Sequence, residues 1–366
     1  MGTGSTVGGK SVGRSSSELI GSLRSDIASG AYAVGSFLPS VRQLAGDHKI
    51  APETARRALK ALESEGLVIA LPGSGYQVTS RANNPRAGCP LAFLDWRSGQ
   101  EGTVRDFNDQ LLAELKAAAD SRGWSLLTLS IANMAPAVVA ERLKSVRAFG
   151  AALSIPDRGV ADALTGLGLP VVVLDDAGDG LGTDSIMQDG HQGGVLAARH
   201  LIAAGCRRVA WFGPDDCNAH TLARFGGFAA GLFCEKRSVE PQLTFSVPPE
   251  ETQAAARRIL SGPDRPDGVA ALWQGHAAAL QRAAGELGLV AGRDFQMIGW
   301  CPEEHYRDGY ESLFAGGPVP PAVTWSIRTM AFTAAARMAE RRENPSLPAL
   351  SVKVPVRLLG TEALRH

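Results

Sequence analysis

The cationic side chains of a predicted helix that begins at Pro52 and ends at Gly66 could bind the phosphates and base edges of DNA. Pro52 suits the first helical position, where its missing amide costs nothing. One side of this helix is apolar and carries Ala55, Ala58, Leu59 and Leu62. The candidate DNA contacts are Glu53, Thr54, Arg56, Arg57 and Lys60. The same cations could equally be solvent-exposed charges on an ordinary helix, so the neighbouring segments must decide.

Those neighbouring segments predict a winged helix-turn-helix. A shorter helix begins after Ser40, whose hydroxyl can accept a hydrogen bond from a free amide of the first turn. Residues 46–49 then interrupt the helical pattern, as the turn of this motif requires. Short strands at 67–71 and 76–79 follow the second helix and are joined by a Gly-rich turn. This order of elements predicts an α-helical DNA-binding domain with a β-wing over residues 17–79.

The stretch resembles the N-terminal domain of the GntR family of bacterial regulators over roughly residues 17–80. The matching residues are Leu38-Pro39-Ser40, Arg42, Leu44-Ala45, Ala58-Leu59, Leu62, Glu65-Gly66-Leu67, Pro72-Gly73, Gly75 and Val78. The resemblance implies that Arg42, the second helix and the wing tip contact DNA. It adds four further candidates, Ser40, Gly73, Ser74 and Gly75. Many members open the second helix with Ser-Arg, but this chain has Ala51-Pro52, so no operator sequence follows from the resemblance.

Composition describes an ordinary globular protein with an uneven distribution of charge. The chain has 366 residues, 45% hydrophobic and 20% charged, which is enough for two domains and a sizeable core. The formal net charge is zero, which argues against a protein devoted wholly to nucleic acid. Residues 1–88 carry ten Lys and Arg against six Asp and Glu, a net charge of +4, so the remainder carries −4. This sign is the one expected if the N-terminal part meets phosphates.

The five cysteines indicate reduced thiols in a cytoplasmic protein. Cys89, Cys206, Cys217, Cys234 and Cys301 are scattered and show no metal-ligand spacing. The sequence contains no run of about 18 apolar residues that could span a membrane, and its first residues lack the apolar segment of a secretory signal.

Two polar stretches flank the predicted DNA-binding domain. Residues 1–16 are rich in Gly and Ser and are expected to form a disordered arm, in which Lys10 and Arg14 could also touch DNA. Residues 80–88 contain Asn, Pro and Gly and are predicted to be an interdomain linker.

From residue 89 to the C-terminus the pattern alternates between strands and helices. Short apolar strands recur, for example at 91–94 and 170–174, with helical segments between them. The alternation restarts at Gly193 and ends with a predicted strand at 350–356. It predicts an α/β domain over residues 89–366 with two doubly wound lobes and a cleft between them. Ligands favour the carboxyl ends of the strands in such sheets.

The stretch from Asp189 resembles the LacI-type effector domain, which is related to periplasmic sugar-binding proteins. The matching residues are Asp189, Gly193-Gly194, Ala198, His200-Leu201, Gly205, Arg207-Arg208-Val209-Ala210 and Gly213, with Arg224 to Phe228 and Pro320 to Thr324 further along. The resemblance covers roughly residues 89–360. A GntR-type domain joined to a LacI-type sensor is the arrangement of AraR-like sugar-responsive repressors.

Six residues are candidates for ligand binding. The resemblance implies that Arg224 and Asp175 contact the ligand. Asp95 and Trp96 end the first strand of the domain and are expected to face the cleft, where the indole could stack on a sugar. Gln274 and Cys301 lie where the resemblance puts acids: sugar-binding members carry Asn-Asp where this chain has Gln274-Gly275, and Asp-Asp where it has Cys301-Pro302. Without those acids, an ordinary aldose is less favoured as the ligand, because its hydroxyls would lose charged acceptors. Two alternatives remain, a ligand with an anionic group or one bound largely by aromatic contact.

These features together predict a transcriptional regulator, most simply a repressor that binds a near-palindromic operator as a homodimer and responds to a small metabolite, a sugar or sugar derivative. The alternative is an enzyme on a doubly wound fold with an accessory DNA-binding domain. The usual nucleophile, phosphate-binding and zinc-protease motifs do not occur in the sequence. His191, His220, His276 and His305 lie far apart and are more often structural than catalytic. A periplasmic binding protein is the third possibility. The sequence therefore predicts no catalytic residue, cofactor or metal.

Overall fold

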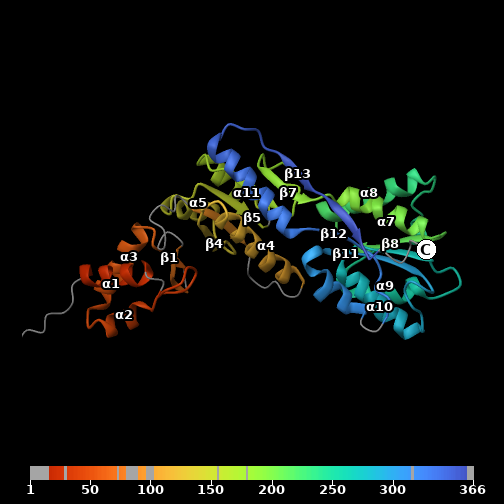
Figure 1. Ribbon diagram of the computed structural model, residues 1–366, viewed down its shortest axis with the longest axis horizontal. Coiled ribbons are helices and arrows are strands. Elements are labelled where there is room, and N and C mark those ends of the chain that lie inside the picture. Colours follow the sequence, from red (N-terminus) through yellow and green to blue (C-terminus); the bar gives the residue numbers. More distant parts are fainter. Residues whose placement is uncertain are drawn as a thin grey trace, which may run out of the picture. The chain divides into compact units, whose positions relative to one another are not determined.

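The computed structural model describes residues 16–28, 31–71, 74–79, 90–95, 103–154, 156–178, 180–314 and 317–360. The predicted linker, and the predicted arm except for Ser16, lie outside these residues. The described chain forms two compact units (Figure 1). The first comprises residues up to 95, residues 116–171 and residues 338–346, and the second comprises residues 103–115, 172–337 and 347–360.

The N-terminal part of the first unit is a winged helix-turn-helix. Its elements are α1 (Ser16–Ala28), α2 (Val41–Asp47), α3 (Pro52–Ser64), β1 (Val68–Leu71) and β2 (Gly75–Val78). The two strands are antiparallel, with Val68 opposite Val78 and Leu71 opposite Gly75. The predicted apolar stripe of α3 is buried and packs with leucines of α1 and α2, so the stripe prediction is confirmed. Burial of one face of α3 leaves the opposite face to solvent.

The N-cap prediction at Ser40 is also confirmed. Its Oγ accepts from the Gln43 amide at 3.3 Å, and the Gln43 side chain accepts from the Ser40 amide at 2.8 Å. This reciprocal capping box satisfies two amides at the start of α2. α3 begins with Pro52 after an Ala51 that makes no side-chain cap, and Gly66 follows the helix with φ of 72°. A positive φ suits glycine, so Gly66 can end the helix without strain.

The rest of the first unit is an α/β layer built on three parallel strands. These strands are β3 (Leu91–Asp95), β4 (Leu126–Ser130) and β5 (Gly150–Leu153), with β3 in the middle. Two helices, α5 (Pro136–Ser145) and α6 (Arg158–Gly166), pack against each other and bury Leu143 and Leu164 in the same core. The sequence also forms α4 (Thr103–Asp120) between β3 and β4.

The second unit contains one ladder of three parallel strands, β6 (Val171–Leu174), β7 (Asp184–Gln188) and β13 (Ser351–Val354). It also contains a six-stranded sheet in the order β14-β12-β11-β10-β8-β9. The strands of this sheet are β8 (Val209–Pro214), β9 (Thr244–Val247), β10 (Gly268–Ala271), β11 (Gln296–Pro302), β12 (Ala322–Trp325) and β14 (Val356–Leu359). All pairings are parallel except that of β12 with β14.

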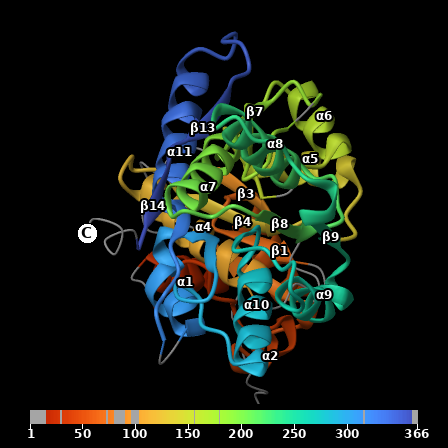
Figure 2. The ribbon, with the colours of Figure 1, turned by 90° about the vertical axis from the view of Figure 1, so that its right-hand side faces the viewer.

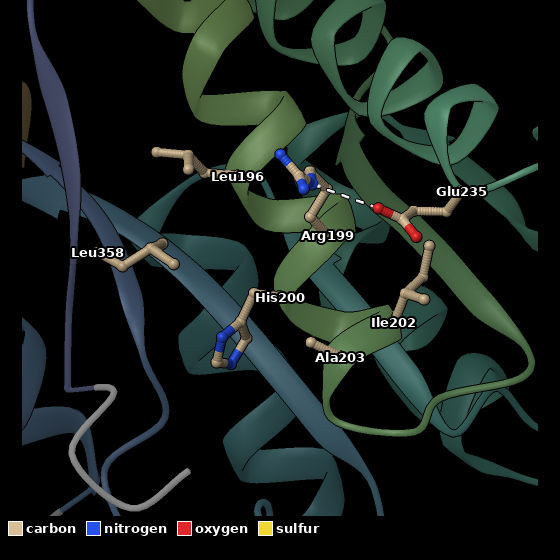
Figure 3. Close-up of a pocket in the computed structure, with 7 residues that line it drawn as sticks. All are labelled: Leu196, Arg199, His200, Ile202, Ala203, Glu235 and Leu358. Atoms are coloured by element: carbon tan, nitrogen blue, oxygen red, sulfur yellow. Dashed lines mark hydrogen bonds and ion pairs between the residues drawn. The ribbon is translucent and has the colours of Figure 1, made fainter. Parts of the chain in front are cut away.

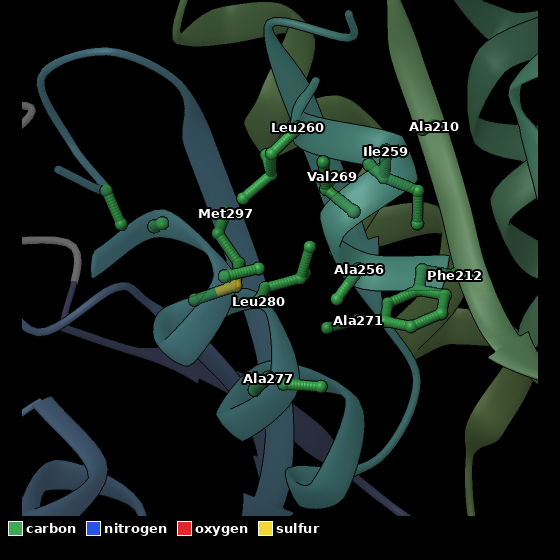
Figure 4. Packing of buried hydrophobic residues seen from close by; sticks show 14 of the residues in the cluster. Ala210, Phe212, Ala256, Ile259, Leu260, Val269, Ala271, Ala277, Leu280 and Met297 are labelled. Carbon is green, nitrogen blue, oxygen red and sulfur yellow. The ribbon is translucent and has the colours of Figure 1, made fainter. Parts of the chain in front are cut away.

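Helices cover this sheet and bury a large apolar core. They are α7 (Gly190–Ala203), α8 (Ala219–Cys234), α9 (Thr252–Leu260) and α10 (Gln274–Leu287). A further helix, α11 (Ile327–Glu343), follows β12, and its residues from 338 onwards belong to the first unit. α7 packs on α8, and α9 packs on α10 (Figure 2). The core under α9 and α10 contains Phe212, Ile259, Val269, Leu280 and Met297, all with at most 1% of their surface exposed (Figure 4). Short 3₁₀ and π turns at Pro241–Leu243, Pro249–Glu251, Glu303–His305, Tyr306–Tyr310 and Glu311–Phe314 connect the larger elements.

Two sequence predictions about strands need correction. The predicted strand at 350–356 is in fact two strands, β13 and β14, divided at Pro355 and paired in different ladders. Proline fixes φ and lacks the amide that would continue the pairing, so the chain changes partner there. The sequence also gave no signal for β7, because its buried positions include Asp184, Ser185 and Gln188.

Candidate functional site

The exposed side of the winged helix carries most of the predicted DNA contacts. Glu53, Arg56, Arg57 and Lys60 are exposed on α3, and Arg42 is exposed on α2. Arg56 donates to Glu53 at 2.9 Å, one helical turn away, and both side chains are more than half exposed. An ion pair this exposed contributes little free energy, so Arg56 can leave Glu53 and bind another anion with little loss of stability.

The remaining predicted contacts lie at the start of α2 and in the wing. Ser74 and Gly75 are exposed, and Gly75 has φ of 109°, which favours glycine where the wing turns back. Gly73 lies outside the described residues. The hydroxyl of Ser40 caps α2, and Thr54 is half-buried in the first turn of α3. A cationic helix face beside a glycine-containing turn has the form of a major-groove reader, and the individual DNA contacts stay predictions.

A second candidate site is a cavity of about 740 Å³ in the second unit. It lies where strands β8 to β12 end, as predicted for a parallel sheet. The strand ends contribute Pro214, Val247, Trp273, Trp300, Cys301, Pro302 and Trp325, and Phe107 adds an aromatic ring from α4. The polar lining residues include Asp175, Asp216, Asn218, His220, Gln274, His276, Arg282 and His305. A volume and lining of this kind suit a small organic molecule.

Arg224 lies in a cage of tryptophans beside this cavity. Its guanidinium carbon lies 4.2 Å from the ring centre of Trp273, 4.4 Å from that of Trp300 and 5.5 Å from that of Trp325. No surface of Arg224 is exposed. Burial lowers the pKa of Arg224 to about 9, against the opposing effect of the Asp175 carboxylate. The π faces therefore stabilise a desolvated cation.

Gln188 at the end of β7 is the hydrogen-bond acceptor for this cage. Its Oε1 accepts from Arg224 Nη2 at 2.8 Å and from Trp300 Nε1 at 3.1 Å. Its amide nitrogen donates to Asp175 at 3.4 Å, while Arg224 Nη1 donates to the Leu272 carbonyl at 2.9 Å. The sequence predicts Arg224 as a ligand contact. In the structure it does not line the cavity, so that role stays a prediction.

Asp175 and His220 form a polar pair in the cavity wall. Asp175 follows β6 with φ of 55°, and its backbone carbonyl accepts from His220 Nε2 at 2.7 Å. The same ring nitrogen lies 3.6 Å from the Asp175 carboxylate. Burial raises the pKa of Asp175, and His220, Arg224 and Gln188 oppose that shift. Asp175 thus lines the cavity, where a ligand hydroxyl could reach it.

His276 and Trp325 present polar atoms that have no hydrogen-bond partner among the described residues. His276 lies in the first turn of α10 with 7% of its surface exposed, and its ring packs edge-on against Phe212 at 4.7 Å. Neither of its ring nitrogens makes a hydrogen bond within 3.5 Å to a described residue, and the ring has only a weaker contact with the Gly213 backbone. Trp325 Nε1, whose residue is 4% exposed, has no partner among the described residues. Burial lowers the pKa of His276 to about 4, and the Gly213 backbone and Asp216 oppose only part of the shift. The imidazole is therefore neutral near pH 7.

The other predicted ligand residues are divided between the two units. Gln274 and Cys301 line the cavity with Asp175, so the structure brings these three together. Burial raises the pKa of the Cys301 thiol to about 12, which makes it an inert part of the wall. Asp95 is buried at the end of β3 in the first unit, and Trp96 lies outside the described residues. Their contribution to ligand binding stays a prediction.

Sequence reasoning missed most of the aromatic cage. Trp273 and Trp325 gave no motif, and Gln188 lay in the strand that was not predicted. The available signal was positional, since each Trp sits at or just after the end of a strand that alternation alone could locate. Parallel strands bring such positions to one edge of the sheet.

A smaller cavity of about 350 Å³ lies between α7, β14 and the end of α8 (Figure 3). Its walls are mainly aliphatic, with Leu196, Ile202 and Leu358, and Arg199 bonds to Glu235 across its edge at 3.3 Å. Burial lowers the pKa of His200, which also lines it. None of the predicted site residues lies here.

The described part of the chain has neither a cluster of metal-binding side chains nor a helix that could span a membrane. No group of three or more His, Cys, Asp or Glu there could hold a metal ion. None of the helices there is long and apolar enough to cross a membrane.

Two protein families match separate parts of the chain. The gntR family of bacterial regulatory proteins matches residues 15–78, and the periplasmic binding protein-like domain matches residues 198–360. The arabinose metabolism transcriptional repressor of Geobacillus stearothermophilus is 24% identical over 291 residues, covering 75% of this chain and 78% of the repressor. The transcriptional repressor PurR of Mannheimia succiniciproducens is 27% identical over 134 residues, and the match spans only 40% of its length.

Solved structures show the same fold. A LacI-family transcriptional regulator from Enterococcus faecium with bound ribose has a TM-score of 0.58 and 19% identity, covering 74% of this chain and 96% of that one. The transcriptional regulator CelR in complex with cellobiose has a TM-score of 0.61 and 17% identity, covering 93% and 97%. These likenesses confirm the predicted α/β fold.

Proposed function

We propose that this chain, which belongs to the bacterial regulators that join a gntR-family DNA-binding domain to a periplasmic-binding-protein-like domain, represses transcription under the control of a sugar or sugar derivative. The relatives named above are transcriptional repressors, so the enzyme alternative is set aside. Such a regulator works where the chromosome is, in the bacterial cytoplasm.

The DNA-binding half of the proposal rests on the exposed face of α3. Arg57 and Lys60 are exposed there without an ion pair among the described residues, while the opposite face is buried. We assign residues 17–79 to DNA binding, with residues 1–16 as an arm and 80–88 as a linker. A homodimer would place two copies of α3 in successive major grooves, which requires a near-palindromic operator.

The sensing half rests on the cavity at the strand ends, within the proposed effector domain at residues 89–366. Aromatic rings and convergent polar groups suit a sugar, whose C–H faces stack on indole while its hydroxyls hydrogen-bond. One relative is named for arabinose metabolism, and two structural neighbours hold ribose and cellobiose. Ligand binding would favour one conformation of the effector domain and so change the spacing of the two DNA-binding domains.

A mobility-shift titration on the DNA upstream of the chain's own gene tests the proposal. The variant Arg57→Ala/Lys60→Ala should weaken binding strongly. The slope of log affinity against log salt should fall by about 4, because the homodimer loses two phosphate contacts in each of its two chains. Arg257→Ala is the matched control, since Arg257 is an exposed cation on α9 that pairs with Glu286. No shift at low salt by folded wild-type protein would refute the DNA-binding function.

A further inference from the structure

The charges around the large cavity disfavour a charged ligand. Two carboxylates line it, Asp175 and Asp216. The lining cation, Arg282, is exposed and bonds to Gln253 at 3.0 Å. Arg224 has no exposed surface and does not line the cavity; its two terminal nitrogens donate to oxygens, while its Nε has no hydrogen-bond partner among the described residues. An anion entering this cavity would therefore lose its water next to carboxylates without gaining a free buried cation.

A cationic ligand meets the opposite obstacle. The same tryptophan faces that would attract it already hold the guanidinium of Arg224 at 4.2 and 4.4 Å. A second positive charge against those rings would be repelled by the first in a poorly solvated site. An uncharged ring would not meet this repulsion, so it could still stack on the tryptophans.

The polar atoms that lack partners show where such a ligand would be held. His276 is neutral: its acceptor nitrogen has no partner in the described part of the chain, and its N–H has only a weak contact with the Gly213 backbone. The indole of Trp325 offers one further donor. Both residues are more than nine-tenths buried and both line the cavity. Buried donors and acceptors are costly to leave unpaired, so a ligand that pairs them binds with an advantage.

We propose that the cavity selects an uncharged ring-shaped ligand, and that His276 and Trp325 bind its polar edge as specificity-determining residues. This inference rests on the proposed function, in which the cavity takes the effector. It decides between the two alternatives that the sequence leaves open, in favour of aromatic contact over an anionic group.

The first experiment separates charge selection from the existence of a ligand. A small-molecule extract of the source bacterium is divided on anion- and cation-exchange resins into uncharged, anionic and cationic fractions, and each is tested for thermal stabilisation of the full-length protein. Ribose and arabinose, with ribose 5-phosphate and glucosamine as charged counterparts, are tested alongside. Stabilisation by the uncharged fraction or uncharged sugars is expected. Stabilisation by charged compounds alone would overturn the inference. No stabilisation by any sample would instead refute the effector cavity itself, leaving the DNA-binding result to stand separately.

The second experiment uses the compound that stabilises the protein and measures its Kd for variants. Trp325→Phe keeps the ring but removes the N–H, and should raise the Kd about three- to tenfold. His276→Phe should do the same or more, whereas His276→Asn or His276→Gln, which keep a donor and an acceptor, should restore binding to within about threefold. Trp124→Phe, outside the cavity lining, is the matched control and should leave the Kd unchanged. Wild-type binding by both Phe variants in the cavity, with unfolding midpoints near that of wild type, would overturn the assignment of these residues.

Discussion

Removing the acceptor of the buried cation should harm the protein more than removing the cation itself. Gln188→Leu takes away the oxygen that accepts from both Arg224 and Trp300 and leaves both donors buried. A hydrogen bond to a charged group contributes about 1.5–3 kcal/mol, and an unsatisfied buried donor costs about 1–3 kcal/mol. The expected loss for Gln188→Leu is therefore about 3–5 kcal/mol of unfolding free energy.

Arg224→Met should lower the unfolding free energy far less, because the contacts of the buried charge only just offset the free energy of burying it. The shift of its pKa from 12.5 to about 9 corresponds to about 5 kcal/mol of disfavoured charge. The two hydrogen bonds that the guanidinium donates stabilise the folded state by about 3–6 kcal/mol, and two cation–π contacts add about 1–4 kcal/mol. Methionine removes both sides of this balance and fills similar space. We expect a change within about 2 kcal/mol.

The assay is urea unfolding of the two single variants and the double variant, followed by tryptophan fluorescence, to which the cage contributes three of the six tryptophans. The double variant should be more stable than Gln188→Leu, because of the two buried donors that Gln188 serves only the uncharged Trp300 N–H is then left unpaired. Gln192→Leu, an exposed glutamine on α7, is the matched control and should stay within about 0.5 kcal/mol of wild type. Additive losses in the double variant, or an Arg224→Met loss equal to that of Gln188→Leu, would refute the break-even account.

Two further predictions concern the same unit. Gly227→Ala should lower the unfolding free energy by about 3 kcal/mol or more, because its Cβ would lie 1.9 Å from the His191 carbonyl oxygen where α7 packs on α8. Gly226→Ala has no neighbour closer than 4.0 Å and should stabilise the protein by up to about 1 kcal/mol. Thermal unfolding of both variants measures this contrast, and equal effects would contradict the packing argument. The pKa of His276 falls from 6.5 to about 4 on folding, so as the pH is lowered the unfolded chain takes up a proton here before the folded chain does. The unfolding free energy should therefore fall by about 3 kcal/mol between about pH 6.5 and pH 4. His276→Gln should remove that part of the fall, and an unchanged pH profile in this variant would show that the imidazole titrates normally.

The winged helix could be predicted from sequence because its signals are local. Ser40, Pro52 and Gly66 each mark a helix end through the backbone of their own few residues. The apolar stripe of α3 repeats within four turns of one helix. Such patterns need no knowledge of distant partners, and α2 and α3 begin where they predict.

The elements that sequence reasoning missed depend on distant partners. β7 buries Asp184 and Ser185, which a periodicity argument reads as exposed. In the structure Asp184 pairs with Arg337 at 2.9 Å, and the Ser185 hydroxyl donates to that of Ser351 at 3.0 Å. These partners lie more than 150 residues away in the chain. Polar side chains are buried in β7 because these distant partners satisfy their hydrogen bonds. The strand therefore contains no apolar run that the sequence alone could reveal.

The tryptophan cage follows from the two positions where the resemblance predicts acids and this chain has none. Gln274-Gly275 stands in place of Asn-Asp and Cys301-Pro302 in place of Asp-Asp, and Trp273 and Trp300 immediately precede these two pairs. A buried guanidinium without those carboxylates still needs compensation, and here the two indole faces and the Gln188 oxygen provide it. Because the compensating groups are neutral, the positive charge of Arg224 has no acid at positions 275, 301 and 302, where the resemblance predicts one. Charge balance in the site then depends on Asp175 alone among the groups that act on the pKa of Arg224. An uncharged ligand leaves that balance undisturbed, whereas an anion would compete with Asp175 for the same cation.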